Sequence, residues 1–476
     1  MSDPFIVIGA DAAGLSAASK CRRDNPSREV IVFERGEWIS YAHCGTPYFI
    51  KGAVDKLTDL QSLTPSAVEK RGIELQRKHA ATAIDTVSHT VTVAGPHETQ
   101  DVDYDALLIA TGAEAIEAPI EGSNLGNVFS LHGLDDAANI RALLEPPTEF
   151  SSDRLGGGGY LDTDTVQTYG AREPPETVAI IGGGYVGIEM AEAFRAWDCR
   201  VHLFQRGETL LPAFGEAVGD IVAERLTDAN VELHLDTEVT ALTGTGGTVS
   251  AVTCDTGAQI PIDAALIGIG IKPNTELIAD TPIESGRTGA IQTDKYGQTT
   301  VDDVYAAGDV AEVTHTVTTE PTWSPLGLPA NRVGRAIGMT IAGSPTPVGS
   351  VVETAMLKAF DLECGRSGIL DNERAEAAGF EPRSQTITAQ SRSGYYPGAA
   401  ETTVTLMADA TTGRLLGGSI VGTDRAAVRI NTIATALGGE FTVGELELQD
   451  LGYAPPFSPV WDPILTAAKV LHGRVG

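Results

Sequence analysis

Short apolar runs and a helical stretch alternate at the start of the chain. The run Phe-Ile-Val-Ile at 5–8 and the run Glu-Val-Ile-Val-Phe-Glu at 29–34 have the composition of strands, and residues 15–23 have that of a helix. A Gly-rich turn separates the first strand from the helix. A strand, a turn, a helix and a second strand in this order predict a βαβ unit.

The same pattern returns in the middle of the chain. Strand-like runs at 178–181 and 200–204 flank a glycine-rich turn and a helical stretch at 188–197. The glycines of this turn have the spacing of dinucleotide-binding units, in which phosphates bind at the helix N-terminus. The turn residues expected to contact a cofactor are Gly182, Gly184, Tyr185 and Gly187.

The first turn follows that spacing less closely. Gly9 permits a tight bend and Gly14 permits close packing of helix on strand, but Asp11 stands where the middle glycine is usual. We still expect a phosphate-binding turn, because it lies between a strand and a helix as the motif requires. The expected cofactor contacts here are Gly9, Asp11, Ala12, Ala13 and Gly14.

The two units differ at the end of the second strand. The first ends in Glu34 and Arg35, whereas the second ends in Gln205 and Arg206. A carboxylate here favours a free ribose 2′-hydroxyl, and its loss beside an arginine accommodates a 2′-phosphate. The first unit therefore suits the adenosine of FAD and the second favours NADPH over NADH. The alternative is that Arg206, like Arg35, points to solvent.

Two further apolar strands fit a large flavin domain. One runs into Thr111 and Gly112, and the other ends in Gly308 and Asp309, whose carboxylate could bind a ribityl hydroxyl. Either could instead be a buried strand with an ordinary turn. Their positions before and after the second βαβ unit favour a flavin domain that is interrupted by a nicotinamide domain.

We therefore predict an α/β fold with two Rossmann-like domains and a third, α+β domain. The FAD domain is expected at 1–120 and 270–344, the NAD(P)H domain at 121–269, and the C-terminal domain at 345–476. Within the second domain, residues 145–176 are rich in Pro, Gly and Ser, which predicts a long surface loop or linker with no assigned chemistry.

Charge and composition exclude several classes of protein. The 476 residues include 64 acidic and 33 basic side chains, giving a formal net charge of −31. Such a charge disfavours nucleic acid and anionic membranes as partners. The acid excess with few lysines resembles the surface of halophilic proteins. No apolar run is long enough to span a bilayer and no signal peptide is evident, so we expect a cytoplasmic protein.

One of the five cysteines stands apart. Cys44 lies just before Pro47, which is well placed in the first turn of a helix. The helix dipole would then lower the pKa of the thiol and favour the thiolate. The alternative is an inert core residue, which is the interpretation we give to the other four cysteines. No C-x-x-C pair or metal-type cluster is present, so no metal site is predicted.

Several motifs in order resemble one family. They are G-A-D-A-A-G, S-Y-x-x-C-G-x-P-Y, I-A-T-G, I-G-G-G-Y-V-G-I-E and Y-A-A-G-D, with Tyr-Tyr-Pro-Gly-Ala at 395–399 and Tyr-Ala-Pro-Pro-Phe at 453–457. Together they resemble the single-cysteine class of FAD- and NAD(P)-dependent pyridine nucleotide-disulfide oxidoreductases, and most of all coenzyme A disulfide reductase and NADH oxidase. The resemblance implies that NAD(P)H reduces FAD, with Glu189 near their interface, and that a sulfur species is then reduced at Cys44.

The resemblance also implies a substrate site and a homodimer. Tyr395, for which Tyr396 is a local alternative, and Tyr453 correspond to tyrosines that the partner subunit contributes to catalysis. Arg22 is expected to meet coenzyme A phosphates, although a basic residue there also complements the helix dipole. Ser40 and His43 are the other expected substrate contacts. The family's coenzyme A reductases often have Asn where His43 stands.

Coenzyme A disulfide is the favoured substrate, because the peroxidases and oxidases of this class carry a histidine in the first turn, where this chain has Ala12. Three alternatives stay open: an NADH oxidase that cycles through a cysteine sulfenic acid, a polysulfide or persulfide reductase, and an electron-transfer flavoprotein. The sequence does not separate these sulfur substrates from one another.

Overall fold

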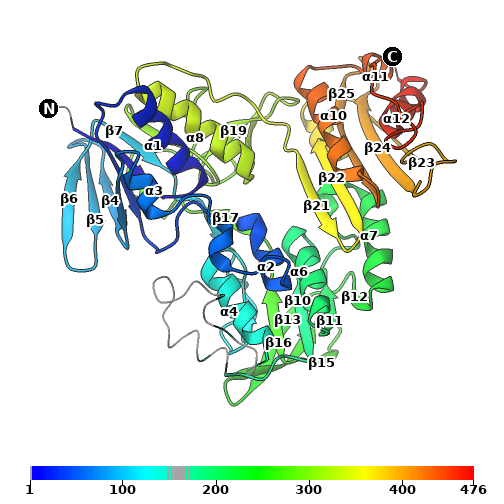
Figure 1. The fold of residues 1–476 in the computed structure, drawn as a ribbon, viewed down its shortest axis with the longest axis horizontal. Coiled ribbons are helices and arrows are strands. Elements are labelled where there is room, and N and C mark those ends of the chain that lie inside the picture. Colours follow the sequence, from blue (N-terminus) through cyan, green and yellow to red (C-terminus); the bar gives the residue numbers. More distant parts are fainter. Residues whose placement is uncertain (1–2, 147–150, 152–153, 155–167, 169–170, 476) are drawn as a thin grey trace.

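The computed structural model describes residues 3–146, 151, 154, 168 and 171–475, and shows three units (Figure 1). The long loop predicted at 145–176 lies mostly outside the described residues. The α/β class, with two Rossmann-like units and a C-terminal α+β unit, is confirmed.

The first unit is built on a parallel sheet with the strand order β18-β7-β1-β2-β3. Its strands are β1 (Phe5–Ile8), β2 (Val30–Glu34), β3 (Glu74–Arg77), β7 (Ala106–Ile109) and β18 (Val304–Ala306). Helices α1 (Ala12–Asp24) and α8 (Gly327–Ile341) pack together on this sheet. A Cβ at Gly334 would lie 2.1 Å from the carbonyl oxygen of Ala13, so only glycine permits this close helix packing.

Smaller elements complete the first unit. An antiparallel meander of β4 (Ala80–Asp85), β5 (Thr90–Ala94) and β6 (Thr99–Asp103) lies beside the sheet. The remaining elements are α3 (Pro65–Glu69), the pair β8 (Ala113–Ala115) and β17 (Ile271–Pro273), and the pair β19 (Glu312–Thr314) and β20 (Pro321–Trp323).

The second unit repeats the parallel design, with the order β12-β11-β10-β16-β9. Its strands are β9 (Val128–Phe129), β10 (Thr177–Ile181), β11 (Arg200–Phe204), β12 (Val231–His234) and β16 (Ala264–Ile267). Helices α4 (Leu134–Leu144) and α6 (Tyr185–Ala196) share one hydrophobic core with one face of this sheet. The meander β13 (Val239–Thr245), β14 (Thr248–Cys254) and β15 (Gln259–Pro261) covers the other face.

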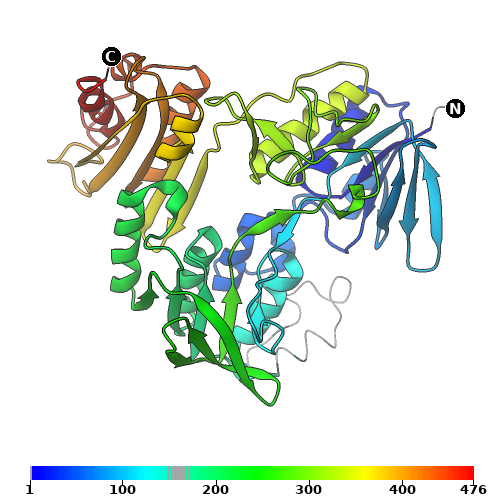
Figure 2. The ribbon, with the colours of Figure 1, turned by 180° about the vertical axis from the view of Figure 1, so that it is seen from behind.

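The C-terminal unit is an antiparallel sheet with helices. The strand order is β21-β22-β25-β24-β23, and both figures place it at the opposite end of the molecule from the first unit (Figures 1 and 2). Its strands are β21 (Ala355–Ala359), β22 (Leu362–Gly368), β23 (Pro382–Gln390), β24 (Glu401–Asp409) and β25 (Leu415–Gly422). Its helices are α9 (Asn372–Ala377), α10 (Ala426–Gly438), α11 (Val443–Glu447) and α12 (Pro463–His472), and α7 (Glu216–Asp228) of the second unit contacts this sheet.

One short helix connects the first two units. Helix α2 (Thr46–Lys51) belongs to the chain segment of the first unit, yet it packs against α4 and α6 of the second. Trp197 donates a 2.8 Å hydrogen bond to the carbonyl oxygen of Ile50, which fixes this contact. The residues just before α2, including Cys44, are thereby held between the two nucleotide-binding sheets. Among the described residues, no helix is long and apolar enough to cross a membrane.

Candidate active site

The first glycine-rich turn has the backbone shape of a phosphate-binding turn. Gly9 has φ +106°, and a Cβ there would lie 2.2 Å from the carbonyl oxygen of Ala110. A Cβ at Gly14 would lie 1.9 Å from the carbonyl oxygen of Gly9. Helix α1 begins at Ala12 directly after the turn, so its free backbone N–H groups face the turn. This arrangement fits the pyrophosphate of FAD.

Glu34 lies against that turn. Its carboxylate accepts hydrogen bonds from the backbone N–H of Ala10 at 3.0 Å and of Gly36 at 2.8 Å. Burial raises the pKa of Glu34, and the two backbone N–H groups partly offset this shift. The carboxylate is thus held beside the turn, where a ribose hydroxyl of FAD would lie.

Thr111, which was predicted to contact the flavin, follows β7 at the same edge of the first sheet. The Thr111 hydroxyl donates to the backbone carbonyl of Asn274, and the Asn274 side-chain amide donates to the Thr111 carbonyl, both at 2.8 Å. Asn274 Oδ1 is buried without a hydrogen-bond partner within the described protein, which leaves an acceptor for a bound group. Asn274 was not predictable from the sequence, because only a Lys-Pro-Asn segment marks it.

Asp309 follows β18 at this edge. Gly308 has φ +79°, and a Cβ there would lie 3.1 Å from the Cβ of Ala13 in α1, so the segment approaches the helix closely. Burial raises the pKa of Asp309 to about 6, although nearby His43 opposes the shift. The predicted flavin contacts of β1, β2, β7 and β18 therefore converge on one sheet edge, and they fit FAD.

Cys44 lies one turn before α2. It belongs to the 3₁₀ turn η1 (His43–Gly45), and Pro47 occupies the first turn of α2 as predicted. All five cysteines are free thiols; Cys44 is exposed, and the other four are buried. Cys44 therefore has no protein thiol within the chain with which to form an internal disulfide.

The prediction that α2 lowers the pKa of Cys44 is wrong, because the protein groups around this thiol raise its pKa. Protein atoms around the sulfur replace part of its solvent, and this desolvation raises the pKa of the thiol. The carboxylates of Glu189 and Asp309 raise it further. Because α2 is only six residues long, its dipole does not outweigh the desolvation and these two negative charges. The same observation brings Cys44 close to Glu189 and Asp309.

Glu189 reaches this region from α6 of the second unit. Burial raises the pKa of Glu189 to about 7, while a hydrogen bond from the Tyr48 hydroxyl at 3.3 Å opposes the shift. The raised pKa brings the protonation of Glu189 into the neutral pH range. Tyr48 ends the motif that contains Cys44, but the motif alone indicates no role for it.

Asp11 and His43 form an ion pair beside Cys44. His43 Nε2 lies 2.7 Å from Asp11 Oδ2, and His43 Nδ1 lies 2.9 Å from the carbonyl oxygen of His132. Both ring nitrogens face acceptors, which favours the doubly protonated imidazolium. Burial lowers the pKa of His43, but the Asp11 carboxylate and the His132 carbonyl outweigh it and raise the pKa. Asp11 also accepts a 3.1 Å hydrogen bond from the backbone N–H of Tyr41.

The second glycine-rich turn reproduces the first. Gly182 has φ +116°, and a Cβ at Gly187 would lie 1.9 Å from the Gly182 carbonyl oxygen. Gln205 accepts a 3.0 Å hydrogen bond from the backbone N–H of Gly183, and the exposed Arg206 follows it. These groups fit the adenosine and pyrophosphate of NAD(P)H. The Tyr185 hydroxyl accepts from Arg366 at 2.9 Å and so contacts the C-terminal unit.

Two of the expected substrate contacts, Ser40 and Arg22, lie in different segments of the first unit. Ser40 lies beside the first turn, with φ +47° and its N–H bonded to the Ala10 carbonyl. The Arg22 side chain donates to the carbonyl oxygens of Pro26 and Arg28, so the loop after α1 already uses its guanidinium.

Tyr395 and Tyr453 lie on the C-terminal unit. Tyr395 is 77% exposed and Tyr453 is 48% exposed. Neither is among the groups that surround Cys44 within one chain.

Comparisons with known proteins agree with this geometry. Residues 3–324 match a family model described as pyridine nucleotide-disulphide oxidoreductase, and residues 354–463 match the dimerisation domain of the same family. The chain is 38% identical, over 99% of both chains, to the NAD(P)H coenzyme A polysulfide/persulfide reductase of Pyrococcus horikoshii. It is 30% identical to an NADH oxidase of Methanocaldococcus jannaschii, covering 98% of this chain and 97% of that protein.

A solved structure is similar throughout the chain. The NAD-dependent persulfide reductase from A. fulgidus is 30% identical, with a TM-score of 0.89, over 99% of this chain and 83% of that one.

Proposed function

The chain belongs to the pyridine nucleotide-disulphide oxidoreductases, enzymes that use FAD and NAD(P)H, and we propose that it reduces the sulfur–sulfur bond of a coenzyme A disulfide or persulfide at Cys44. The observation that carries this proposal is the exposed Cys44 thiol, which lies near the carboxyl groups of Glu189 and Asp309 while the other four cysteines are buried as free thiols. A single thiol can be oxidised only to a mixed disulfide, a persulfide or a sulfenic acid.

The reaction that this geometry supports begins at the sulfur of Cys44. The Cys44 thiolate attacks the substrate disulfide, forms a mixed disulfide and releases one thiolate. Two electrons from NAD(P)H then cleave the mixed disulfide, releasing the second thiolate and restoring Cys44. One NAD(P)H and one proton thus convert one disulfide to two thiols. Bound FAD would supply the hydride acceptor that connects NAD(P)H to the sulfur chemistry.

The carboxyl group of Glu189 lies where it can hold a proton beside Cys44. With a pKa of about 7, Glu189 can hold a proton near neutral pH. Protonated Glu189 no longer repels the thiolate, so the proton on Glu189 and the charge on Cys44 favour each other. Glu189 can also return its proton to a departing thiolate.

The hydrogen bonds of His43, the histidine nearest to Cys44 in the sequence, disfavour the oxidase alternative. Both ring nitrogens of His43 are occupied by Asp11 and by the His132 carbonyl. At the turn position where the resemblance places the oxidases' histidine, the chain has Ala12.

The proposal is tested by anaerobic oxidation of NADPH and NADH with coenzyme A disulfide or coenzyme A persulfide, in high salt because of the net charge of −31. We expect turnover that falls at least ~10³-fold in Cys44→Ser, while NAD(P)H still reduces the bound flavin of that variant. Turnover with oxygen alone, or full activity in Cys44→Ser, would overturn the proposal. The ratio of the two substrates identifies the sulfur species.

We also propose a homodimer in which Tyr395 and Tyr453 of one subunit assist Cys44 of the other. Both tyrosines lie in the C-terminal unit with other exposed apolar residues, namely Phe457, Val460 and Trp461. A mixed dimer of Cys44→Ser with a Tyr395→Phe/Tyr453→Phe chain would then keep one intact site and about half the activity. If the tyrosines act within their own chain, the mixed dimer has no intact site.

A further inference from the structure

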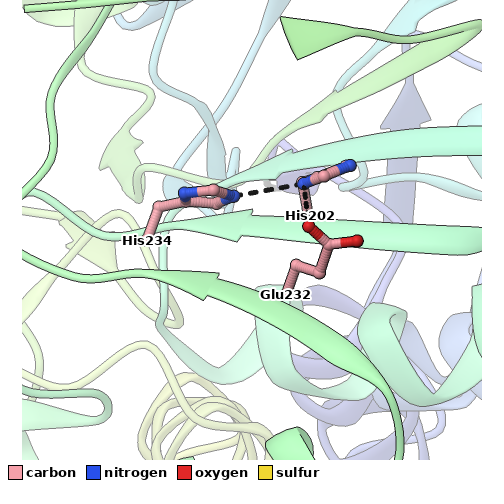
Figure 3. A group of neighbouring side chains, drawn as sticks. All are labelled: His202, Glu232 and His234. Atoms are coloured by element: carbon pink, nitrogen blue, oxygen red, sulfur yellow. Dashed lines mark hydrogen bonds and ion pairs between the residues drawn. The ribbon is translucent and has the colours of Figure 1, made fainter. Parts of the chain in front are cut away.

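Three side chains gather on one face of the second sheet. His202 comes from β11, and Glu232 and His234 come from the neighbouring edge strand β12 (Figure 3). The parallel register pairs His202 with Glu232 and Phe204 with His234. Since alternate residues of a strand share a face, the three polar side chains project on the same side of the sheet.

Their polar atoms converge on one small volume. His202 Nδ1 lies 3.1 Å from His234 Nε2 and 3.4 Å from Glu232 Oε2. Two ring nitrogens that face each other at this distance cannot both carry a hydrogen, so at least one lone pair points into the shared space. The three side chains point toward one another in Figure 3.

These separations match those of ligands around one metal ion. Zn²⁺ binds imidazole nitrogen at about 2.0–2.1 Å and carboxylate oxygen at about 2.0–2.2 Å in a tetrahedral arrangement, which places neighbouring ligand atoms about 3.3 Å apart. The candidate ligand atoms all lie within 4.8 Å of one another. Two imidazoles and one carboxylate favour a first-row transition ion over Mg²⁺ or Ca²⁺, which prefer oxygen ligands.

The surroundings hold the ligands and leave one side open. The His202 side chain is only 8% exposed, whereas that of Glu232 is 57% exposed. The Phe204 ring stacks on His234 with centroids 4.4 Å apart and an interplanar angle of 9°, which fixes that imidazole. An ion could therefore enter from solvent and keep water as a fourth ligand.

We propose that His202, Glu232 and His234 form a binding site for a divalent transition metal ion, Zn²⁺ by ligand chemistry. The ion would tie the edge strand β12 to β11. It would also lie close to the adenosine end of the NAD(P)H site, because the His234 carbonyl accepts a 2.9 Å hydrogen bond from the backbone N–H of Gln205. The sequence alone did not predict this site, since the two histidines are 32 residues apart.

The test uses holoenzyme without an affinity tag, stripped of metal with a chelator and titrated with Zn²⁺ by calorimetry. We expect one Zn²⁺ per chain, with affinity reduced about tenfold or more in His234→Gln and in Glu232→Gln. Both positions are at least partly exposed, so these variants should fold. The matched control is His97→Gln, an exposed histidine in the first unit, which should bind as the wild type does.

Zinc X-ray absorption identifies the ligand atoms. We expect only nitrogen or oxygen, at about 2.0–2.1 Å. A sulfur shell near about 2.3 Å would place the ion on a cysteine and overturn the proposal. Absence of binding, or equal binding by both ligand variants and the control, would also overturn it and leave a stacked histidine pair of purely structural role.

Discussion

The two nucleotide-binding units place identical demands on their outer glycines and differ at the position between them. The first glycines, Gly9 and Gly182, have φ of +106° and +116°. In both units a Cβ on the third glycine, Gly14 or Gly187, would lie 1.9 Å from the carbonyl oxygen of the first. Backbone packing within the protein therefore requires glycine at these outer positions.

The middle position follows a different constraint. A Cβ at Gly184 would meet no atom within 4 Å, so protein packing does not require glycine there. The first unit has Asp11 at the corresponding position, and its carboxylate binds His43 and the Tyr41 backbone. The outer glycines therefore serve the fold, whereas the middle residue is available either for close approach of a phosphate or for organising the cysteine segment.

Adding a methyl group at the third glycine of each turn, or at the middle glycine of the second turn, should have very different effects on stability. We expect Gly14→Ala and Gly187→Ala each to lower the free energy of unfolding by about 3 kcal/mol, because the new Cβ overlaps a backbone oxygen. Gly184→Ala should change it by less than about 0.5 kcal/mol. Urea denaturation of the three variants measures this, and equal losses in all three would contradict the distinction.

The two units also differ in the side chain that accepts a hydrogen bond from a backbone N–H of the turn, which is Glu34 in the first unit and Gln205 in the second. We expect Gln205→Glu to lower the ratio of kcat/KM for NADPH to that for NADH at least about tenfold, because a carboxylate repels the 2′-phosphate. Steady-state kinetics with both nucleotides measure the ratio. Glu34→Gln is the matched control and should leave it unchanged. An unchanged ratio in Gln205→Glu would remove the basis for an NADPH preference.

Substitution of Glu189 tests the interaction between the second unit and Cys44 of the first unit. Burial, Glu189 and Asp309 together raise the pKa of Cys44, so Glu189→Gln should lower that pKa and increase the alkylation rate of reduced enzyme at neutral pH. In the wild type, Glu189 loses its proton near pH 7 and then opposes thiolate formation. The rate should therefore rise less steeply with pH above 7 than in the variant. Parallel profiles would show that Glu189 does not act on Cys44. Glu208→Gln, an exposed site, is the control.

The smallest expected effect concerns the middle position of the first turn. Asp11→Asn removes the carboxylate that raises the pKa of His43, so that pKa should fall, because burial then opposes the imidazolium. An NMR titration of the His43 ring measures it. A group whose pKa is raised by folding stabilises the protein below its unfolded pKa, and this stability is lost as pH rises through the folded value. The Asp11→Asn variant should therefore not lose stability as pH rises through that range. An unchanged pKa of His43 would contradict the ion pair.

Much of the fold could be predicted because the pattern is local. The predicted strands at 5–8 and 200–204 are β1 and β11, and the predicted helices at 15–23 and 188–197 lie largely within α1 and α6. The predicted boundaries at 120, 270 and 344 stay predictions. Several contacts of the site were not predictable, because Asn274 lies 163 residues from Thr111 and Tyr48 lies 141 residues from Glu189.

The amino-acid sequence alone was enough to predict the two βαβ units, the distinctive position of Cys44 and the choice of acid or amide at the end of each second strand. Each of these depends on neighbours within about 25 residues, through hydrogen bonding, hydrophobic periodicity and the conformational freedom of glycine. Only the tertiary structure decided that the cysteine lies between two carboxyl groups from different units, and that its pKa is therefore raised rather than lowered. It alone also placed Asp11 against His43 and brought His202 beside His234. Electrostatic and coordination interactions act over a few ångströms in space, and folding alone sets which distant residues come that close.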